Sequence, residues 1–177
     1  IPPVLRGSQP TDGGNLVVEE KDYVEVSSDP IAAKYLRPFR MGKELVRGLD
    51  RWCLWLEDII PSDIAKSSVL KARLEAVRTM REKSTKQATR DFASTPHLFT
   101  EIRQPDTSYV GIPAVVSETR PFYTVAHLPA EVIAGNKLYT ALDPDGFLFA
   151  IISSSMFITW QKAVGGRLKS DLSLFLM

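Results

Sequence analysis

The spacing of apolar residues between positions 62 and 92 constrains the fold of this chain more than any other feature. Ser62, directly after Pro61, is suited to cap a first helical turn, and Pro96 cannot continue a helix. Between them, apolar side chains recur at helical spacing: Ile64, Val69, Leu70, Leu74, Val77 and Met80. The pattern therefore predicts one long amphipathic helix that ends near Phe92.

Most of the remaining chain consists of short extended segments separated by turn-forming residues. These segments are predicted at 16–18, 23–26, 98–126 around Pro113 and Pro121, and 132–142 around Gly135-Asn136. A β-hairpin is predicted where two runs, 44–47 and 51–56, flank Gly48-Leu49-Asp50. The second run is apolar on both faces, which predicts a buried central strand.

Residues 147–164 form the last apolar segment, which reads as a strand or a helix and ends at Gly165-Gly166. Three of its residues follow helical spacing: Met156, Trp160 and Val164. The whole pattern predicts an α+β fold of short mixed or antiparallel strands, with a β-hairpin and two principal helices. We expect one domain over 1–177, with 62–95 as a candidate helical subdomain.

The overall charge does not point to a partner, because 22 basic residues balance 21 acidic ones and leave a net charge of +1. A nucleic-acid partner would therefore have to be recognised by local charge. The longest apolar run, Phe147 to Ile152, is too short to cross a bilayer, so no membrane partner is expected. The chain begins at Ile1 with neither an initiator methionine nor a signal peptide, and we expect a domain excised from a longer protein.

Cysteine and histidine usage argues against a catalytic or metal centre. Cys53 lies between Trp52 and Leu54, which predicts a buried, inert thiol in a reducing compartment. His97 and His127 stand alone, without metal-ligand spacing. No Gly-x-Ser-x-Gly elbow or paired Cys/His nucleophile is present.

The predicted helix carries a local excess of positive charge. Against Asp63, Glu75 and Glu82, segment 63–90 has eight basic residues: Lys66, Lys71, Arg73, Arg78, Arg81, Lys83, Lys86 and Arg90. Such a helix can displace counterions from DNA phosphates, although on charge alone a solvated helix face is the better explanation. Guanidinium geometry suits phosphate, so the predicted phosphate contacts are arginines: Arg73, Arg78, Arg81, Arg90 and, outside the helix, Arg167.

The run from Gly165 to Asp171 contains the most specific chemical signal. A tight Gly165-Gly166 turn would present Lys169 and Asp171 two residues apart, on one edge if the segment is extended. In the major groove, guanine O6 and N7 accept hydrogen bonds and cytosine N4 donates one, so a lysine and a carboxylate match a G·C pair. From the residues alone, a pair that reads bases and a Lys–Asp neighbour pair on the surface are equally good interpretations.

Other polar turns carry weaker signals. Ser117-Glu118-Thr119-Arg120 follows an apolar strand and in isolation is best explained as a surface turn. The turns at 12–15 and 42–44 lack the spacing of a phosphate-binding loop.

Several stretches together resemble the MmeI-type family of combined restriction–modification enzymes, in which one chain joins an endonuclease, an adenine methyltransferase and a target recognition domain. The resembling stretches are in family order and cover essentially the whole chain: 7–14, 35–39, Arg51 to Leu56, 78–81, 117–120 and 160–171. The resemblance implies that this region chooses the DNA sequence, and that its partner is double-stranded DNA.

The resemblance also implies roles for particular residues. Lys169 and Asp171, which flank Ser170 after Gly-Arg-Leu, would contact one base pair, and the lysine/aspartate version goes with guanine. The turn of Asn136 and Lys137 is similar to another base-contacting stretch, where Asn136 is suited to read adenine N6 and N7. Glu118 and Arg120 are second-rank base or backbone contacts.

Departures from the family concern catalysis. The Asn-Pro-Pro-Tyr motif and the Gly-rich S-adenosylmethionine loop are absent, and Asp143-Pro144-Asp145-Gly146 is a turn. A flipped adenine would find no pocket, so we expect this fragment neither to methylate nor to cleave. Residues Thr124 to His127 stand where members of the family usually have Ile-Pro and Gly. The last strand is expected to be truncated at Met177.

The parent protein implied by the resemblance is a bacterial, cytoplasmic, site-specific DNA adenine-N6 methyltransferase with an endonuclease. S-adenosylmethionine and Mg²⁺ would belong to that parent, with no cofactor in this fragment. Its methyltransferase domain, on the same parent chain, would be a second partner.

Two alternatives come from other classes of protein. One is a non-catalytic protein-interaction module whose basic helix docks an acidic partner. The other is an enzyme that uses Glu118 and Asp171 as acid and base, which requires a deep pocket joining the two carboxylates.

Overall fold

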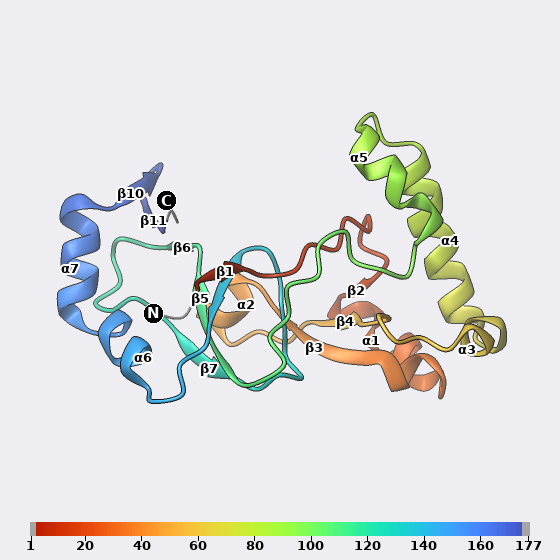
Figure 1. Ribbon diagram of the computed structural model, residues 1–177, viewed down its shortest axis with the longest axis horizontal. Helices are drawn as coiled ribbons and strands as arrows, with labels where there is room; N and C mark the ends of the chain where they lie inside the picture. The colour runs from red at the N-terminus through yellow and green to blue at the C-terminus, as the bar shows by residue number, and fades with distance from the viewer. Residues whose placement is uncertain (1–2, 175–177) are drawn as a thin grey trace. The chain divides into compact units, whose positions relative to one another are not determined.

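The computed structural model describes residues 3–174 and has the predicted α+β fold (Figure 1). The chain divides into two compact units. Unit 1 comprises residues up to Gly7, 40–49 and 103 onward, and unit 2 comprises 8–39 and 50–102.

Unit 2 contains a small antiparallel sheet in which β4 (Trp52–Leu54) lies between β2 (Val17–Val18) and β3 (Leu36–Arg40). The central position predicted for the apolar run at 51–56 is therefore confirmed. Cys53 pairs with Val17 on one side and Arg37 on the other, and it is fully buried. Burial raises the pKa of the Cys53 thiol, as expected for an inert cysteine.

The long helix predicted for unit 2 is divided into four pieces: α3 (Pro61–Lys66), α4 (Ser68–Glu82), α5 (Gln87–Arg90) and the 3₁₀ helix η2 (Asp91–Ser94). Ser67 causes the first break, because its hydroxyl accepts from the Leu70 amide at 3.0 Å and donates to Asp29 at 2.7 Å. Ser62 does not cap the helix as predicted. Ile60 is at the N-cap and Pro61 at the first helical position, where a missing N–H costs nothing.

Two segments predicted as strands are helices. Residues 23–26 lie in α1 (Glu20–Ser28), which is followed by the 3₁₀ helix η1 (Ala32–Tyr35). Residues 44–47 lie in α2 (Gly42–Arg47), so the predicted hairpin over 44–56 is wrong. The Glu44 carboxylate accepts from the Met41 amide at 3.1 Å at the start of α2, and Gly48 ends it with φ 64°.

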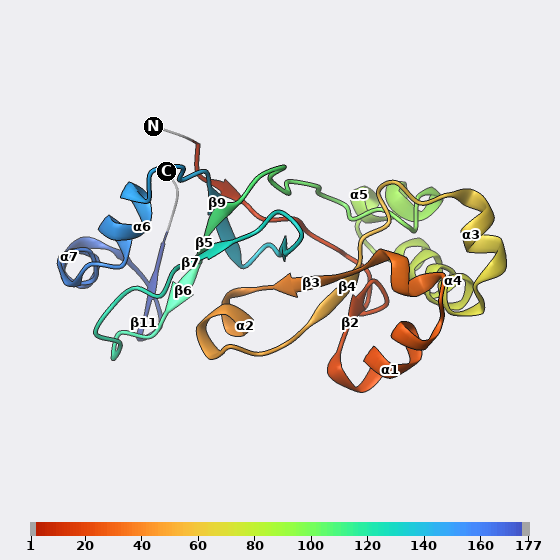
Figure 2. The same ribbon diagram turned by 90° about the horizontal axis from the view of Figure 1, so that it is seen from below.

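Unit 1 is built on the antiparallel sheet β1-β9-β5-β7, whose neighbouring strands β5 and β9 lie side by side in Figures 1 and 2. Its strands are β1 (Leu5–Arg6), β9 (Leu138–Ala141), β5 (Tyr109–Pro113) and β7 (Ala126–Leu128). Every residue of β5 is buried. The fully or nearly buried residues of the main core cluster are Val110, Ile112, Ala114, Val116, Tyr123, Tyr139 and Ile152.

A second antiparallel sheet of unit 1 has the order β10-β11-β6. Its strands are β10 (Gly166–Leu168), β11 (Asp171–Ser173) and β6 (Val115–Val116). The segment left open as strand or helix is helical, as α6 (Phe147–Ile152) and α7 (Ser155–Val164), with Ser154 capping α7. The short strand β8 (Ile133–Ala134) precedes the turn at 135–137.

Candidate nucleic-acid interface

The turn between β10 and β11 is a hairpin loop of two residues, Lys169 and Ser170. Leu168 pairs with Asp171, so the loop sits directly between paired residues. Lys169 has φ 58°, in the left-handed region. The chain bends at Gly165 between α7 and β10, but the turn that presents the charged residues is at Lys169 and Ser170, so Lys169 and Asp171 do not share one edge of an extended segment. The extended conformation fails because the chain reverses at Lys169 itself.

A lysine in the left-handed region is conformationally costly. Glycine adopts this region freely, whereas the Cβ of other L-residues is crowded there, by roughly 1–2 kcal/mol. A side chain held at such a position is a feature that points to function more than to folding.

We predict that Lys169→Gly stabilises the hairpin. The free energy of unfolding should rise by about 0.5–1 kcal/mol, since glycine relieves the left-handed strain. Urea denaturation of the two proteins measures the difference. Ser170→Gly is the matched control, because Ser170 is not among the positive-φ residues and should gain nothing. Equal effects of both substitutions would contradict the assignment of strain to Lys169.

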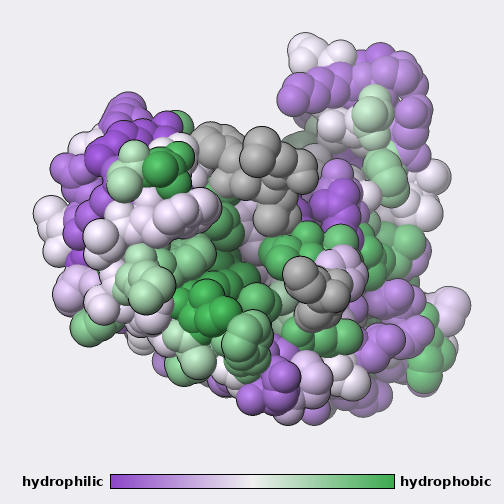
Figure 3. Space-filling model, turned by 60° about the vertical axis from the view of Figure 1, so that its left-hand side comes forward, coloured by the Kyte–Doolittle hydropathy of each residue, from purple (hydrophilic) through white to green (hydrophobic). Residues whose placement is uncertain are grey.

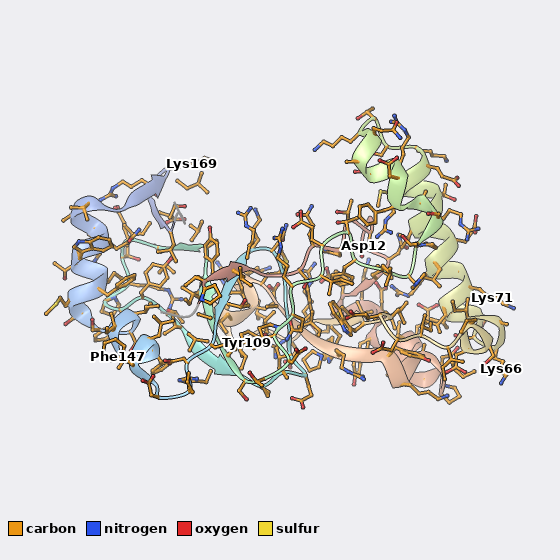
Figure 4. The ribbon with its side chains drawn as sticks, viewed as in Figure 1. Asp12, Lys66, Lys71, Tyr109, Phe147 and Lys169 are labelled. Atoms are coloured by element: carbon orange, nitrogen blue, oxygen red, sulfur yellow. The ribbon has the colours of Figure 1, made fainter. Side chains whose placement is uncertain are left out.

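The charged groups of the hairpin remain available to a ligand. Lys169 is exposed at the end of the hairpin (Figure 4), and Asp171 is partly exposed. Within residues 3–174, neither the Lys169 ammonium nor the Asp171 carboxylate forms a hydrogen bond or ion pair. Both retain their full hydrogen-bonding capacity for a base edge.

The loop that contains Glu118 and Arg120 is brought beside the hairpin, because β11 pairs with β6 just before it. Glu118 Oε2 accepts from Arg167 Nη1 at 2.5 Å, and both side chains are about half exposed. The Arg120 guanidinium donates to Thr124 Oγ1 at 3.1 Å. A base contact by Glu118 or Arg120 and a phosphate contact by Arg167 stay predictions, and each requires these bonds to be shared or exchanged.

The turn at 135–137 is tied to the same part of unit 1. The Ala114 amide donates to the Lys137 carbonyl at 3.0 Å, and the Ala114 carbonyl accepts from the Leu174 amide at 3.0 Å. Ala114 thus links this turn to the end of β11. Lys137 is exposed and Asn136 half-buried, and their base contacts also stay predictions.

Arg81 in unit 2 corrects the predicted set of phosphate contacts. Its side chain is fully buried, and its guanidinium donates at 2.8–3.0 Å to five backbone carbonyls: Pro10, Thr11, Phe92, Thr95 and Leu98. No donor is left for a phosphate. Arg81 therefore holds unit 2 together, and its charge does not contribute to a DNA-binding surface.

The other helix arginines differ in their availability. Arg73 is 12% exposed, donates to the Asn15 carbonyl and lies 3.7 Å from Asp22. Arg90 donates to the Ser84 carbonyl and to Gln87. Arg78, with a 48% exposed side chain and one ion pair to Glu75, is the arginine of α4 best placed to meet a phosphate.

The exposed cations of this segment are mainly lysines. The sequence-based prediction did not include them as phosphate contacts, because it favoured guanidinium groups. Four lysines of the segment are exposed: Lys66, Lys71, Lys83 and Lys86. Lys66 and Lys71 project outward in Figure 4. Lysine has a strongly hydrated ammonium on a flexible side chain, so the exposure of these lysines could have been predicted from the sequence. Arginine is the residue that more often forms buried hydrogen bonds.

Metal-binding clusters and membrane-spanning helices are both missing from the described part of the chain. Among residues 3–174, no group of three or more His, Cys, Asp or Glu residues could hold a metal ion. Within the same range, no helix is both long and apolar enough to span a membrane.

A second surface of unit 1 is apolar. The exposed apolar side chains of α6 and α7 include Phe147, Ile151, Met156, Trp160 and Val164. Phe147, Ile151, Met156 and Trp160 line a groove of about 550 Å³. Figure 3 shows apolar surface among the polar surface of the side that it turns forward. Apolar side chains offer nothing to phosphates, so this face is unsuited to DNA backbone contacts, and exposed apolar patches of this kind mark binding surfaces.

Comparison with known proteins agrees with this geometry. The family model described as MmeI, target recognition domain, matches residues 1–174. DNA methyltransferase A of Bacillus subtilis (strain 168) is 31% identical over 172 residues, which are 97% of this chain and 20% of that protein. The structure of the type IIL restriction-modification enzyme MmeI in complex with DNA matches with a TM-score of 0.92 and 35% identity, over 99% of this chain and 24% of that chain.

An antiparallel hairpin that presents unpaired charges from a small α+β scaffold, together with these matches, defines a DNA sequence recognition module of restriction–modification enzymes. The chain belongs to the MmeI target recognition domain family. The resemblance inferred from sequence is therefore confirmed. The chain spans only about a fifth to a quarter of the length of the two proteins compared.

Proposed function

We propose that this domain reads one G·C pair in the major groove of duplex DNA with the two charged residues that flank Ser170. The Lys169 ammonium would donate to guanine O6 or N7, and the Asp171 carboxylate would accept from cytosine N4. The observation that carries the proposal is that both groups lack partners within residues 3–174 while Lys169 occupies a strained loop position. A Lys–Asp neighbour pair that served only the surface would not need the strained position of Lys169.

A second contact from the 135–137 turn would address a different base pair. The link at Ala114 lies beside the far end of β11, three residues from Asp171. A strand advances about 3.3 Å per residue, so the two contacts are separated by roughly 10 Å along β11. Successive base pairs are about 3.4 Å apart, which would place Asn136 and Lys137 a few pairs away from Lys169.

We further propose that the domain acts within a bacterial, cytoplasmic adenine methyltransferase and restriction enzyme. The support is that both proteins compared are much longer than this chain and that one is named a DNA methyltransferase. S-adenosylmethionine and Mg²⁺ would be held by the remainder of that enzyme. Its methyltransferase domain would be the protein partner, and the apolar face of α6 and α7 offers a surface for a protein contact.

Selection from a randomised duplex library tests the function. The longest natural polypeptide that contains this domain is used, and the bound duplexes are sequenced. We expect one motif with an invariant G·C pair, and we expect Lys169→Ala to lose the preference at that pair alone. A module that docks an acidic protein through its basic helix would enrich no motif, and that outcome would refute the proposal.

We predict that the exposed cations of α4 and of its C-cap, Lys83, supply sequence-independent affinity. Arg78→Ala and Lys83→Ala should each weaken binding to all duplexes alike and reduce the slope of log affinity against log salt by about 1, because one phosphate contact is lost. Fluorescence anisotropy at several salt concentrations measures the slope. The control is Lys21→Ala on α1, where the neighbouring Asp22 and Glu25 disfavour a phosphate. An unchanged slope in both the Arg78 and the Lys83 variant would exclude this helix and its C-cap from the interface.

A further inference from the structure

Gln161 is a buried polar residue directly behind the hairpin. It lies on α7, is 3% exposed, and its Nε2 donates to the Ser173 carbonyl at 3.0 Å. Ser173 belongs to β11, the central strand of its sheet, and pairs with Gly166 on one side and Val115 on the other. The bond therefore joins α7 to the strand that begins with Asp171.

Gly165 leaves space for the Gln161 side chain. A Cβ at position 165 would lie 2.4 Å from Gln161 Cδ and 2.5 Å from the Gln161 carbonyl oxygen, closer than real contacts allow. The φ of Gly165 is −74°, so a left-handed conformation is not what requires glycine here. Close approach of the chain to Gln161 is the reason.

The other attachments of the hairpin lie at its base: the Arg167–Glu118 ion pair, the Leu174 amide on the Ala114 carbonyl, the Tyr139 hydroxyl on the Leu174 carbonyl, and a short ladder with β6. Only Leu172 and Ser173 of β11 pair with β6, while β10 is an edge strand. The hairpin loop projects beyond these two paired residues. A rotation of β11 about so short an anchor would displace the Lys169 and Asp171 side chains relative to a base pair.

We propose that Gln161 is a positioning residue for sequence recognition. Its hydrogen bond fixes β11 against α7, and thereby sets where the hairpin loop presents Lys169 and Asp171. The inference rests on the proposed function, because it concerns the same reading residues. Gly165 is part of this arrangement, because the absence of a Cβ leaves space for the Gln161 amide.

Gln161→Met tests the proposal, because methionine keeps the length of the side chain and loses the donor. The full natural polypeptide is measured by anisotropy on three duplexes: the selected motif, the motif with the Lys169-dependent pair changed, and the motif with another selected pair changed. We expect discrimination at the Lys169-dependent pair to fall by about tenfold, with discrimination at the other pair and affinity for random DNA retained. Gln87→Met, at an exposed glutamine of α5, is the control and should change none of these ratios.

A residue that only stabilises the fold would lower all affinities together with the unfolding midpoint, and that result would overturn the proposal, as would an unchanged ratio. If Gln161→Met does not fold, Gln161→Asn retains an amide that cannot reach Ser173, and the same position-selective loss is expected. If Lys169→Ala leaves the preference intact, the proposed function fails. If Lys169→Ala abolishes it while the Gln161 variants do not, only the positioning role fails.

Discussion

Arg81→Met is expected to destabilise unit 2 by about 3–5 kcal/mol, a larger effect than the loss of any exposed side chain of α4. Methionine fills part of the space, and five carbonyls lose the guanidinium as a donor. The Phe92 and Thr95 carbonyls keep a backbone donor, from the Thr95 and Leu98 amides, whereas no other donor within residues 3–174 replaces the guanidinium at Pro10, Thr11 and Leu98. These carbonyls belong to two separate segments, residues 10–11 and 92–98, which the guanidinium fastens to α4. Each unsatisfied carbonyl costs roughly 1–3 kcal/mol before the structure relaxes.

Urea denaturation followed by tryptophan fluorescence measures this effect, because Trp52 and Trp55 report on unit 2. Arg78→Met is the matched control on the same helix. Its side chain is half exposed with one surface ion pair, so its substitution should change the free energy of unfolding by no more than about 0.5 kcal/mol. Similar values for the two variants would show that Arg81 does not carry the structural role assigned to it.

Exchanging charge across the hairpin loop, by Lys169→Glu combined with Asp171→Arg, is expected to change the preferred base pair. The glutamate would accept from a cytosine or adenine amino group where the lysine donated, and the arginine would donate to guanine where the aspartate accepted. A good base contact discriminates by about 1–3 kcal/mol, or roughly 5- to 150-fold. Preference at the other positions of the motif should remain.

Duplex selection with the doubly substituted full-length polypeptide reads out the change directly. The control exchange, Glu82→Lys with Lys86→Glu, also conserves net charge and concerns two exposed residues near the end of α4. It should leave the motif unaltered. An unchanged motif in the Lys169 and Asp171 variant would exclude these residues from base recognition.

Sequence patterns predicted the elements whose local signals agree with their tertiary environment. The apolar periodicity of α4 and the doubly apolar β4 are examples. The helix α2 was missed because Leu45 and Val46 suit a strand as well as a helix. The two residues that define this helix, Glu44 at its start and Gly48 at its end, are visible in the sequence. However, a glycine before an apolar run is equally typical of a hairpin turn, and the prediction followed that interpretation.

The role of Arg81 could not be predicted from local sequence. Its charge and its place in a basic helix predict exposure, and its five acceptors come from segments that only the fold brings together. The same holds for Glu118 and Arg167, which lie far apart in sequence and meet because β11 pairs with β6. Resemblance to the family identified Lys169 and Asp171, but the position of the chain reversal depended on a backbone angle that composition does not reveal.

The lack of internal partners for Lys169 and Asp171 within residues 3–174 has an evolutionary consequence. Neither side chain forms a hydrogen bond or ion pair that stabilises the fold within that range, and the left-handed backbone at Lys169 gains nothing from a lysine, so replacing either charge is not selected against as destabilising. Under the proposed role of Lys169 and Asp171, two codon changes would alter the recognised base pair while the supporting strands and helix are inherited intact. Such a lineage is expected to diversify its targets faster than its architecture.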